Sequence, residues 1–108
     1  MITRIVKLTF KEDKKDDFIE IWNSSRVLIQ ANPGCNFVEM MQSSEPENVF
    51  FTYSIWDSED DLNAYRRSEL FGKVWKKTKA LFDDKPQAWT TKSHGFEGKL
   101  NKNPDEKD

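Results

Sequence analysis

The chain contains 108 residues, 36% of them hydrophobic and 33% charged, and its formal net charge is −2. This length supports one domain around a single modest core, and the charge excludes a basic surface of the kind that binds nucleic acid. The one cysteine, Cys35, excludes an intramolecular disulfide, and no spacing indicates a metal site. We expect Cys35 to be a small buried hydrophobic residue. No stretch is apolar for long enough to be a signal sequence or a membrane span, so we expect a cytoplasmic protein without a membrane partner.

The first half of the chain predicts a strand, a helix and a second strand. Ile2–Phe10 is rich in β-branched and apolar residues and indicates the first strand. "NPGC", Asn32–Cys35, is strong turn chemistry, and Asn36–Gln42 follows it as a short strand. Between them, Asp13–Gln30 has the period of an amphipathic helix, and its predicted apolar face consists of Phe18, Ile21, Trp22, Ser25, Leu28 and Ile29.

The second half begins with a third strand, Val49–Trp56. Ser58, with Asp61 three residues later, resembles a capping box and predicts a helix through Tyr65. A second helix follows, with a kink between the two as an option near Ser68. Its predicted apolar positions are Leu70, Phe71, Val74, Trp75, Thr78, Leu81 and Phe82.

The chain then returns to a strand. "DDKP", Asp83–Pro86, ends the second helix, and Ala88–His94 predicts the last strand. The order β-α-β-β-α-β predicts an α+β, ferredoxin-like fold, in which one face of a four-stranded antiparallel sheet is covered by the helices. We predict one domain over residues 1–95 and, from its polar composition, a disordered tail over residues 96–108.

The third strand is apolar on both faces. Phe50, Thr52, Ser54 and Trp56 share one face, and Val49, Phe51, Tyr53 and Ile55 share the other. A half-exposed antiparallel strand normally alternates apolar with polar residues, and leaving four large apolar side chains in water forgoes roughly 1.5–3 kcal/mol each. The chain has no further apolar element to cover the second face, so we expect a homodimer that packs sheet against sheet.

The third strand and the helices after it also carry a resemblance. The stretch "FFTYSIWDSEDDLNAYRRSELFGKVW" combines Tyr53 and Trp56 at a strand end with an acidic helix start and a Ser-x-Leu-Phe segment. It resembles the signature region of the antibiotic-biosynthesis monooxygenase (ABM) domain family, and the similarity covers about residues 1–94. The resemblance implies a ferredoxin-like protomer and a dimeric α+β barrel. Characterised members include cofactor-independent monooxygenases of quinol or polyketide-like aromatics, and a heme-degrading branch.

Single positions match this family unevenly. Trp56 stands where the polyketide-oxidising members have a tryptophan implicated at the site. Thr52 and Leu62 replace an asparagine and a tyrosine of those members, Ser54 replaces a glutamate of many relatives, and Tyr65 stands at a histidine position. The resemblance therefore implies monooxygenase activity without supplying a complete set of catalytic residues.

The heme-degrading branch matches less well. Trp75 stands at the position of its helix histidine, and Val6 stands at that of its first-strand asparagine. These departures predict that the protein neither binds nor degrades heme.

The remaining inventory points to an apolar pocket. The sequence has no glycine-rich phosphate loop, and its single histidine, His94, is expected at the surface. We therefore expect no cofactor. Oxygen chemistry without a cofactor needs a water-poor cavity with a few polar groups that orient a small aromatic substrate. The candidate pocket residues, from the third strand and three helical regions, are Trp56, Thr52, Ser54, Tyr65, Trp75 and Trp22.

Two alternatives to catalysis remain open at the level of sequence. Aromatic residues at helical spacing more often pack in a core than line a site, and Trp22 and Trp75 fit that simpler interpretation. A pocket is also all that a non-catalytic small-molecule binder requires. The three hypotheses are a cofactor-independent monooxygenase or related quinone-handling enzyme, a ligand-binding dimer without turnover, and a structural dimer with a filled interior.

Overall fold

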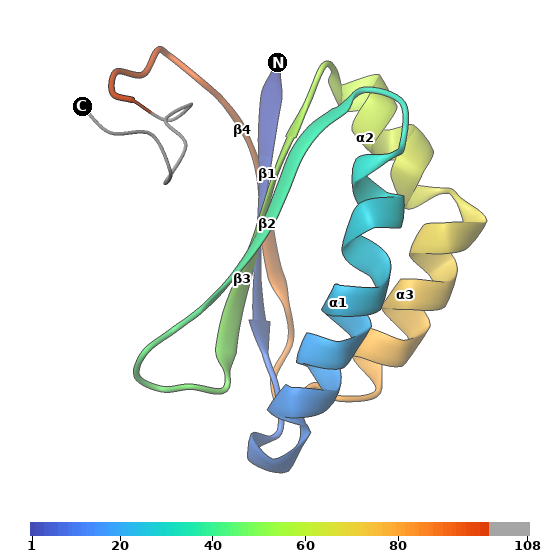
Figure 1. Cartoon of the computed structure of the whole chain (residues 1–108), viewed down its shortest axis with the longest axis vertical. Coiled ribbons are helices and arrows are strands. Elements are labelled where there is room, and N and C mark those ends of the chain that lie inside the picture. The colour runs from blue at the N-terminus through green and yellow to red at the C-terminus, as the bar shows by residue number, and fades with distance from the viewer. Residues whose placement is uncertain (100–108) are drawn as a thin grey trace.

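The computed structural model describes residues 1–99 and confirms the predicted order of elements. Four strands form an antiparallel sheet in the order β2-β3-β1-β4, and all three α-helices lie on one of its faces (Figure 1). This is the ferredoxin-like α+β arrangement. The elements are β1 (Ile2–Thr9), the 3-10 helix η1 (Glu12–Lys14), α1 (Lys15–Gln30), β2 (Cys35–Gln42), β3 (Val49–Trp56), α2 (Glu59–Arg66), α3 (Glu69–Lys79) and β4 (Gln87–Lys92).

The two central strands carry the core. β1 pairs with β3 along its whole length, from Ile2 opposite Trp56 to Thr9 opposite Val49. Since side chains alternate along a strand, every second residue of both strands faces the helices. At one end of that face, Ile2 and Trp56 are buried with Cys35 and Leu62. The buried cluster at the other end consists of Leu8, Phe10, Phe18 and Phe50.

The middle of the helix-facing side carries smaller or polar side chains. Val6 lies opposite Thr52, and Arg4 lies opposite Ser54. On the other side of β1, Val6 lies opposite Ala88. These side chains are smaller than the Phe and Trp side chains at the two ends. The space between sheet and helices is therefore filled less completely at its centre.

The region after β3 forms two separate helices rather than one kinked helix. Ser58 caps α2, because its hydroxyl oxygen accepts a hydrogen bond from the Asp61 backbone N–H at 3.1 Å. Ser68 caps α3 in the same way, accepting from the Phe71 N–H at 3.1 Å. A second serine cap satisfies the free N–H groups of a new helix, and this is why the chain restarts at Ser68.

One predicted core position is wrong. Leu28 was expected on the buried face of α1, but 56% of it is exposed, whereas Phe18, Ser25 and Ile29 of the same helix are buried. α1 packs against β2 and α3, and neither of these covers the side on which Leu28 lies. The prediction for Cys35 is confirmed, since its side chain is buried.

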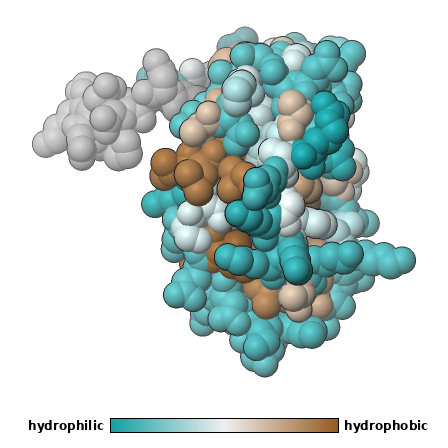
Figure 2. Space-filling model, turned by 90° about the vertical axis from the view of Figure 1, so that its right-hand side faces the viewer, coloured by the Kyte–Doolittle hydropathy of each residue, from teal (hydrophilic) through white to brown (hydrophobic). Residues whose placement is uncertain are grey.

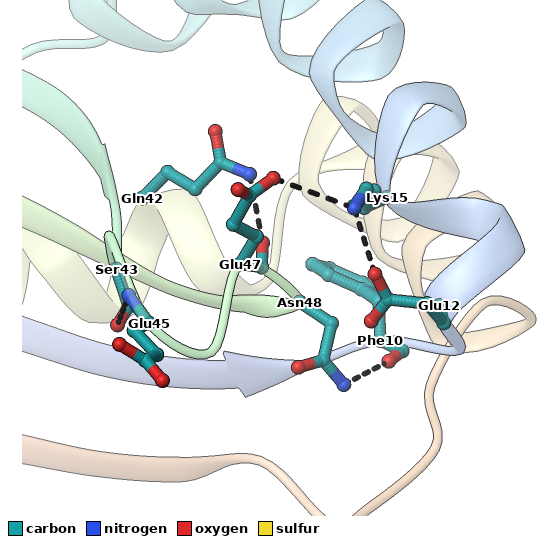
Figure 3. A network of polar contacts seen from close by, with 8 residues as sticks. All are labelled: Phe10, Glu12, Lys15, Gln42, Ser43, Glu45, Glu47 and Asn48. Atoms are coloured by element: carbon teal, nitrogen blue, oxygen red, sulfur yellow. Dashed lines mark hydrogen bonds and ion pairs between the residues drawn. The ribbon is translucent and has the colours of Figure 1, made fainter.

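Polar contacts hold the β2–β3 hairpin to the start of α1 (Figure 3). The Lys15 ammonium lies 2.7 Å from a Glu12 carboxylate oxygen and 3.5 Å from a Glu47 carboxylate oxygen. The Asn48 side-chain amide donates to the Phe10 carbonyl at 2.8 Å. These contacts position α1 over the sheet, and the hydrophobic layer beneath supplies most of the stabilisation.

The outer face of the sheet carries no helix (Figure 1). Phe37, Met41 and Trp89 on this face are 41%, 42% and 47% exposed. Phe37 packs edge to face on Tyr53, with ring centroids 5.7 Å apart. Within residues 1–99, nothing that we describe covers this surface, and residues 100–108 of the predicted tail lie outside the described part.

Candidate functional site

A cavity of about 370 Å³ lies between the sheet and the helices. This volume falls at the small end of the roughly 300–1,000 Å³ of sites for small molecules. All six residues that the sequence suggested for a pocket line it, namely Trp22, Thr52, Ser54, Trp56, Tyr65 and Trp75. The structure thus brings together side chains from α1, β3, α2 and α3, and their part in ligand binding stays a prediction.

The floor of the cavity is the centre of the sheet, where the side chains that face the helices are short. Val6, Thr52 and Ala88 line it from three adjacent strands. None of these side chains reaches far toward the helices, so a space remains that the large residues at either end do not fill. The same pattern explains why the cavity coincides with the polar positions of β3.

Trp56 closes one end of the cavity and is held firmly. Its side chain is only 1% exposed. The indole Nε1–H donates to the Ser54 hydroxyl oxygen at 3.0 Å, and the indole ring stacks on the Tyr65 ring, with centroids 5.2 Å apart and planes 24° apart. A buried tryptophan needs a partner for its N–H, and Ser54, two residues earlier on the same face, provides it.

An aromatic wall continues from Trp56 along the helices. Tyr65 meets Phe71 edge to face, at a centroid distance of 5.3 Å. Phe71 then stacks on Trp75 at 5.9 Å with planes 9° apart. Such pairs contribute about 0.5–1.5 kcal/mol each beyond the area they bury. The wall offers flat apolar surfaces to a planar guest, and Phe71 is a member that sequence reasoning had placed only among core positions.

The Tyr65 phenol is not a base at neutral pH. Burial, with a smaller contribution from Cys35, raises the pKa of Tyr65 to about 12. The hydroxyl therefore stays protonated and can donate a hydrogen bond. His94, the only histidine, is exposed and does not line the cavity.

Two arginines supply all the charge in the cavity lining. Arg4 projects from β1 and Arg66 from the end of α2. The Arg4 guanidinium donates to the Thr90 hydroxyl at 2.8 Å. Burial and the nearby Arg66 charge lower the pKa of Arg4. Sequence reasoning missed Arg4, although a charge at an inward position of an otherwise apolar strand is a readable signal.

Neither a candidate metal site nor a membrane-spanning helix is present in the described part of the chain. Among residues 1–99 there is no cluster of three His, Cys, Asp or Glu side chains that could hold a metal ion. In the same part, no helix is long and apolar enough to span a bilayer.

Figure 2 shows the helix-bearing side, where a largely hydrophilic surface is interrupted by separate hydrophobic patches. Val27 and Leu28 of α1 are exposed, at 71% and 56%.

Solved structures share this fold. A protein from Nitrosomonas europaea superimposes with a TM-score of 0.82 at 17% identity, covering 88% of this chain and 100% of its own. A protein described as an antibiotic biosynthesis monooxygenase gives 0.82 at 13% identity, covering 88% and 100%. A conserved protein from Methanosarcina mazei gives 0.78 at 20% identity, covering 83% and 90%. At these identities the likeness shows the fold alone.

The sequence itself identifies the family. No curated protein matches the chain significantly. Residues 1–77, however, match the family described as Antibiotic biosynthesis monooxygenase. The match extends from β1 through most of α3 and so includes all six candidate residues. Because the matched segment is well over half of the chain, the protein belongs to the antibiotic biosynthesis monooxygenase family.

Proposed function

We propose that the protein is a cofactor-independent monooxygenase, or a closely related quinol-handling oxidoreductase, that acts on a small aromatic or polyketide-like substrate. The observation that carries this proposal is the 370 Å³ cavity with its wall of Trp56, Tyr65 and Trp75. Its volume and flat apolar surfaces suit a planar molecule of two or three rings. Family membership supports the reaction class.

The proposed reaction needs no group beyond substrate, dioxygen and water. The enol form of an anthrone loses a proton to a water molecule and passes an electron to dioxygen. The resulting radical and superoxide combine, and the peroxide anion takes a proton back from water to give a hydroperoxide at the ring carbon. Loss of water then leaves a carbonyl group, so one oxygen atom enters the product and the other leaves as water. The apolar lining would keep bulk water from the intermediate, while Trp56 and the protonated Tyr65 would orient the rings.

We also propose that the working form is a homodimer built through the outer face of the sheet. Phe37, Met41 and Trp89 lie there with large apolar side chains exposed. Exposed apolar surface of this kind marks an interaction site. A second copy of the chain offers the same surface, and two such faces complement each other around a two-fold axis.

Oxygen consumption tests the reaction. The purified protein, freed of metal by a chelator and without added flavin, is mixed with a panel of hydroquinones and anthrones in an oxygen electrode. We expect oxygen uptake above the spontaneous rate and, for an anthrone under labelled dioxygen, one labelled oxygen atom in the product and the other in water. Uptake no faster than that of heat-denatured protein across the whole panel would contradict the proposal.

The runner-up is a ligand-binding homodimer without turnover. It is favoured by one observation, which is that the cavity lining contains no group that could act as a base at neutral pH, since Tyr65 holds its proton. Binding of the same aromatics without oxygen uptake would select this alternative. The third hypothesis, a filled structural module, is disfavoured by the cavity beside Trp56.

A further inference from the structure

The charge on the cavity wall is one-sided. No Asp or Glu among residues 1–99 lines the cavity, whereas Arg4 and Arg66 both do. Within residues 1–99, neither arginine lies within 4.0 Å of a carboxylate oxygen, the distance that defines the ion pairs seen elsewhere in the molecule. Two cations therefore line the same cavity, Arg4 half-buried and Arg66 exposed, and in the described part of the chain neither forms an ion pair.

Such an arrangement is unfavourable unless something compensates it. Like charges repel, and partial burial of a guanidinium adds a desolvation penalty. The effect is visible on Arg4, because burial and the charge of Arg66 both lower its pKa. The Thr90 hydroxyl takes one N–H of Arg4, and a guanidinium has four more donors. The unused N–H donors of Arg4 and the positive charges of the two arginines would therefore favour binding of an anion.

We propose that the ligand of the cavity is an aromatic carboxylate, whose rings lie against the aromatic wall and whose carboxylate group lies between Arg4 and Arg66. This inference rests on the proposed function only in assuming that an aromatic compound enters the cavity. The two oxygens of a carboxylate match the fork of a guanidinium, which binds them by parallel, charge-assisted hydrogen bonds. Arg4 and Arg66 thus determine specificity, selecting acids over neutral aromatics of the same shape.

Calorimetric titration of the full-length protein with naphthoate and with naphthalenemethanol tests the inference. These probes share their rings and differ in charge. At neutral pH and low salt we expect naphthoate to bind at least about tenfold more tightly. Added salt should weaken only naphthoate, because screening acts on the charge and leaves ring packing unaffected.

Substitutions locate the effect. Arg4→Gln and Arg66→Gln should each remove most of the preference for naphthoate and leave the affinity for naphthalenemethanol within about twofold. Arg67→Gln is the matched control, since this neighbouring arginine does not line the cavity, and it should change neither affinity. Arg66 lies at a helix end, so Arg66→Gln keeps the test valid if a change in the central strand at Arg4 impairs folding.

The outcomes separate this inference from the proposed function. Equal affinities for the two probes in the unchanged protein, or an equal loss in Arg67→Gln, would overturn the arginine site while leaving the aromatic cavity in place. Turnover of neutral hydroquinones that is unaffected in both cavity-arginine variants, without any binding of naphthoate, would do the same. Failure of both probes to bind would overturn the arginine site, and the proposed function would fall with it only if oxygen uptake on hydroquinones and anthrones is also absent.

Discussion

Trp56 is the residue on which the functional interpretation depends most. It is buried, hydrogen-bonded to Ser54 and stacked on Tyr65. Trp56→Phe should lose one hydrogen bond and part of the stacking, and we expect the free energy of unfolding to fall by about 1–2 kcal/mol. If Trp56 also contacts the ligand, affinity or oxygen-dependent activity per folded molecule should change by about tenfold or more, equivalent to roughly 1.4 kcal/mol.

Urea denaturation and ligand titration on the same preparation distinguish the two roles of Trp56. A loss of activity that follows the folded fraction alone would show that Trp56 has only a packing role. We expect a loss that remains after correction for the folded fraction, because Trp56 lines the cavity as well as packing in the core.

Tyr65 provides a prediction for alkaline pH. Its pKa is about 12 in the folded protein, against an ordinary value of 10.0. The folded state therefore holds the phenolic proton more tightly, so the stability that this group contributes is complete below about pH 10 and is lost as the pH rises through 12. Between about pH 9 and pH 11 we expect the unchanged protein to lose about 1 kcal/mol more than Tyr65→Phe. Chemical denaturation of both proteins at these pH values gives the difference, and equal losses would show that the phenol titrates normally.

At the scale of elements, the turn between α1 and β2 is held by backbone hydrogen bonds. The Cys35 N–H donates to the Asn32 carbonyl at 3.1 Å, with Pro33 and Gly34 at the centre of the turn. Gly34 has φ of 81°, which is the value for the third position of a type II turn. Its carbonyl accepts from the Asp57 N–H at 2.8 Å, so the turn also fixes the end of β3.

Gly34→Ala should therefore be strongly destabilising. A side chain at this positive φ is strained, and the added Cβ would collide with the Asp61 side chain, which accepts a hydrogen bond from the Ser58 hydroxyl at the start of α2. We expect a loss of at least about 2 kcal/mol in the free energy of unfolding. Gly72→Ala is the control, because a Cβ at this helical position meets nothing within 4 Å and should stabilise α3 by about 0.5–1 kcal/mol. Thermal denaturation that ranked the two variants in the opposite order would refute this account of the turn.

For the whole molecule, the bare outer face of the sheet predicts the homodimer. Sedimentation at micromolar concentration should give a mass near twice 12.7 kDa. Phe37→Glu places a charge on the outer face, and we expect it to shift the protein toward monomer and to lower stability, since obligate dimers often lack a stable protomer. Val27→Glu, at a 71% exposed position of α1 on the helix-bearing side, should leave the mass unchanged. A stable monomer of the unchanged protein would contradict the prediction.

Sequence alone determined the order of the elements and many of their ends. Val49–Trp56 was predicted with the bounds that β3 has, and the Ser58 cap with its partner Asp61 was read correctly. These features depend on neighbours within four residues, so period, caps and turn chemistry record them directly. Where a choice depended on a distant partner, as at Leu28, the pattern failed because α1 has no neighbour on that side.

Only the tertiary structure decided what lies at the centre of the molecule. The cavity is the difference between the space that sheet and helices enclose and the volume of the side chains that fill it, and no local pattern contains that difference. That Arg4 and Arg66 line the same cavity depends likewise on α2 packing against the sheet. The sequence could propose Trp56, Thr52 and Ser54 for a pocket because one strand places them on one face, whereas the unbalanced charge beside them exists only once separate elements have packed together.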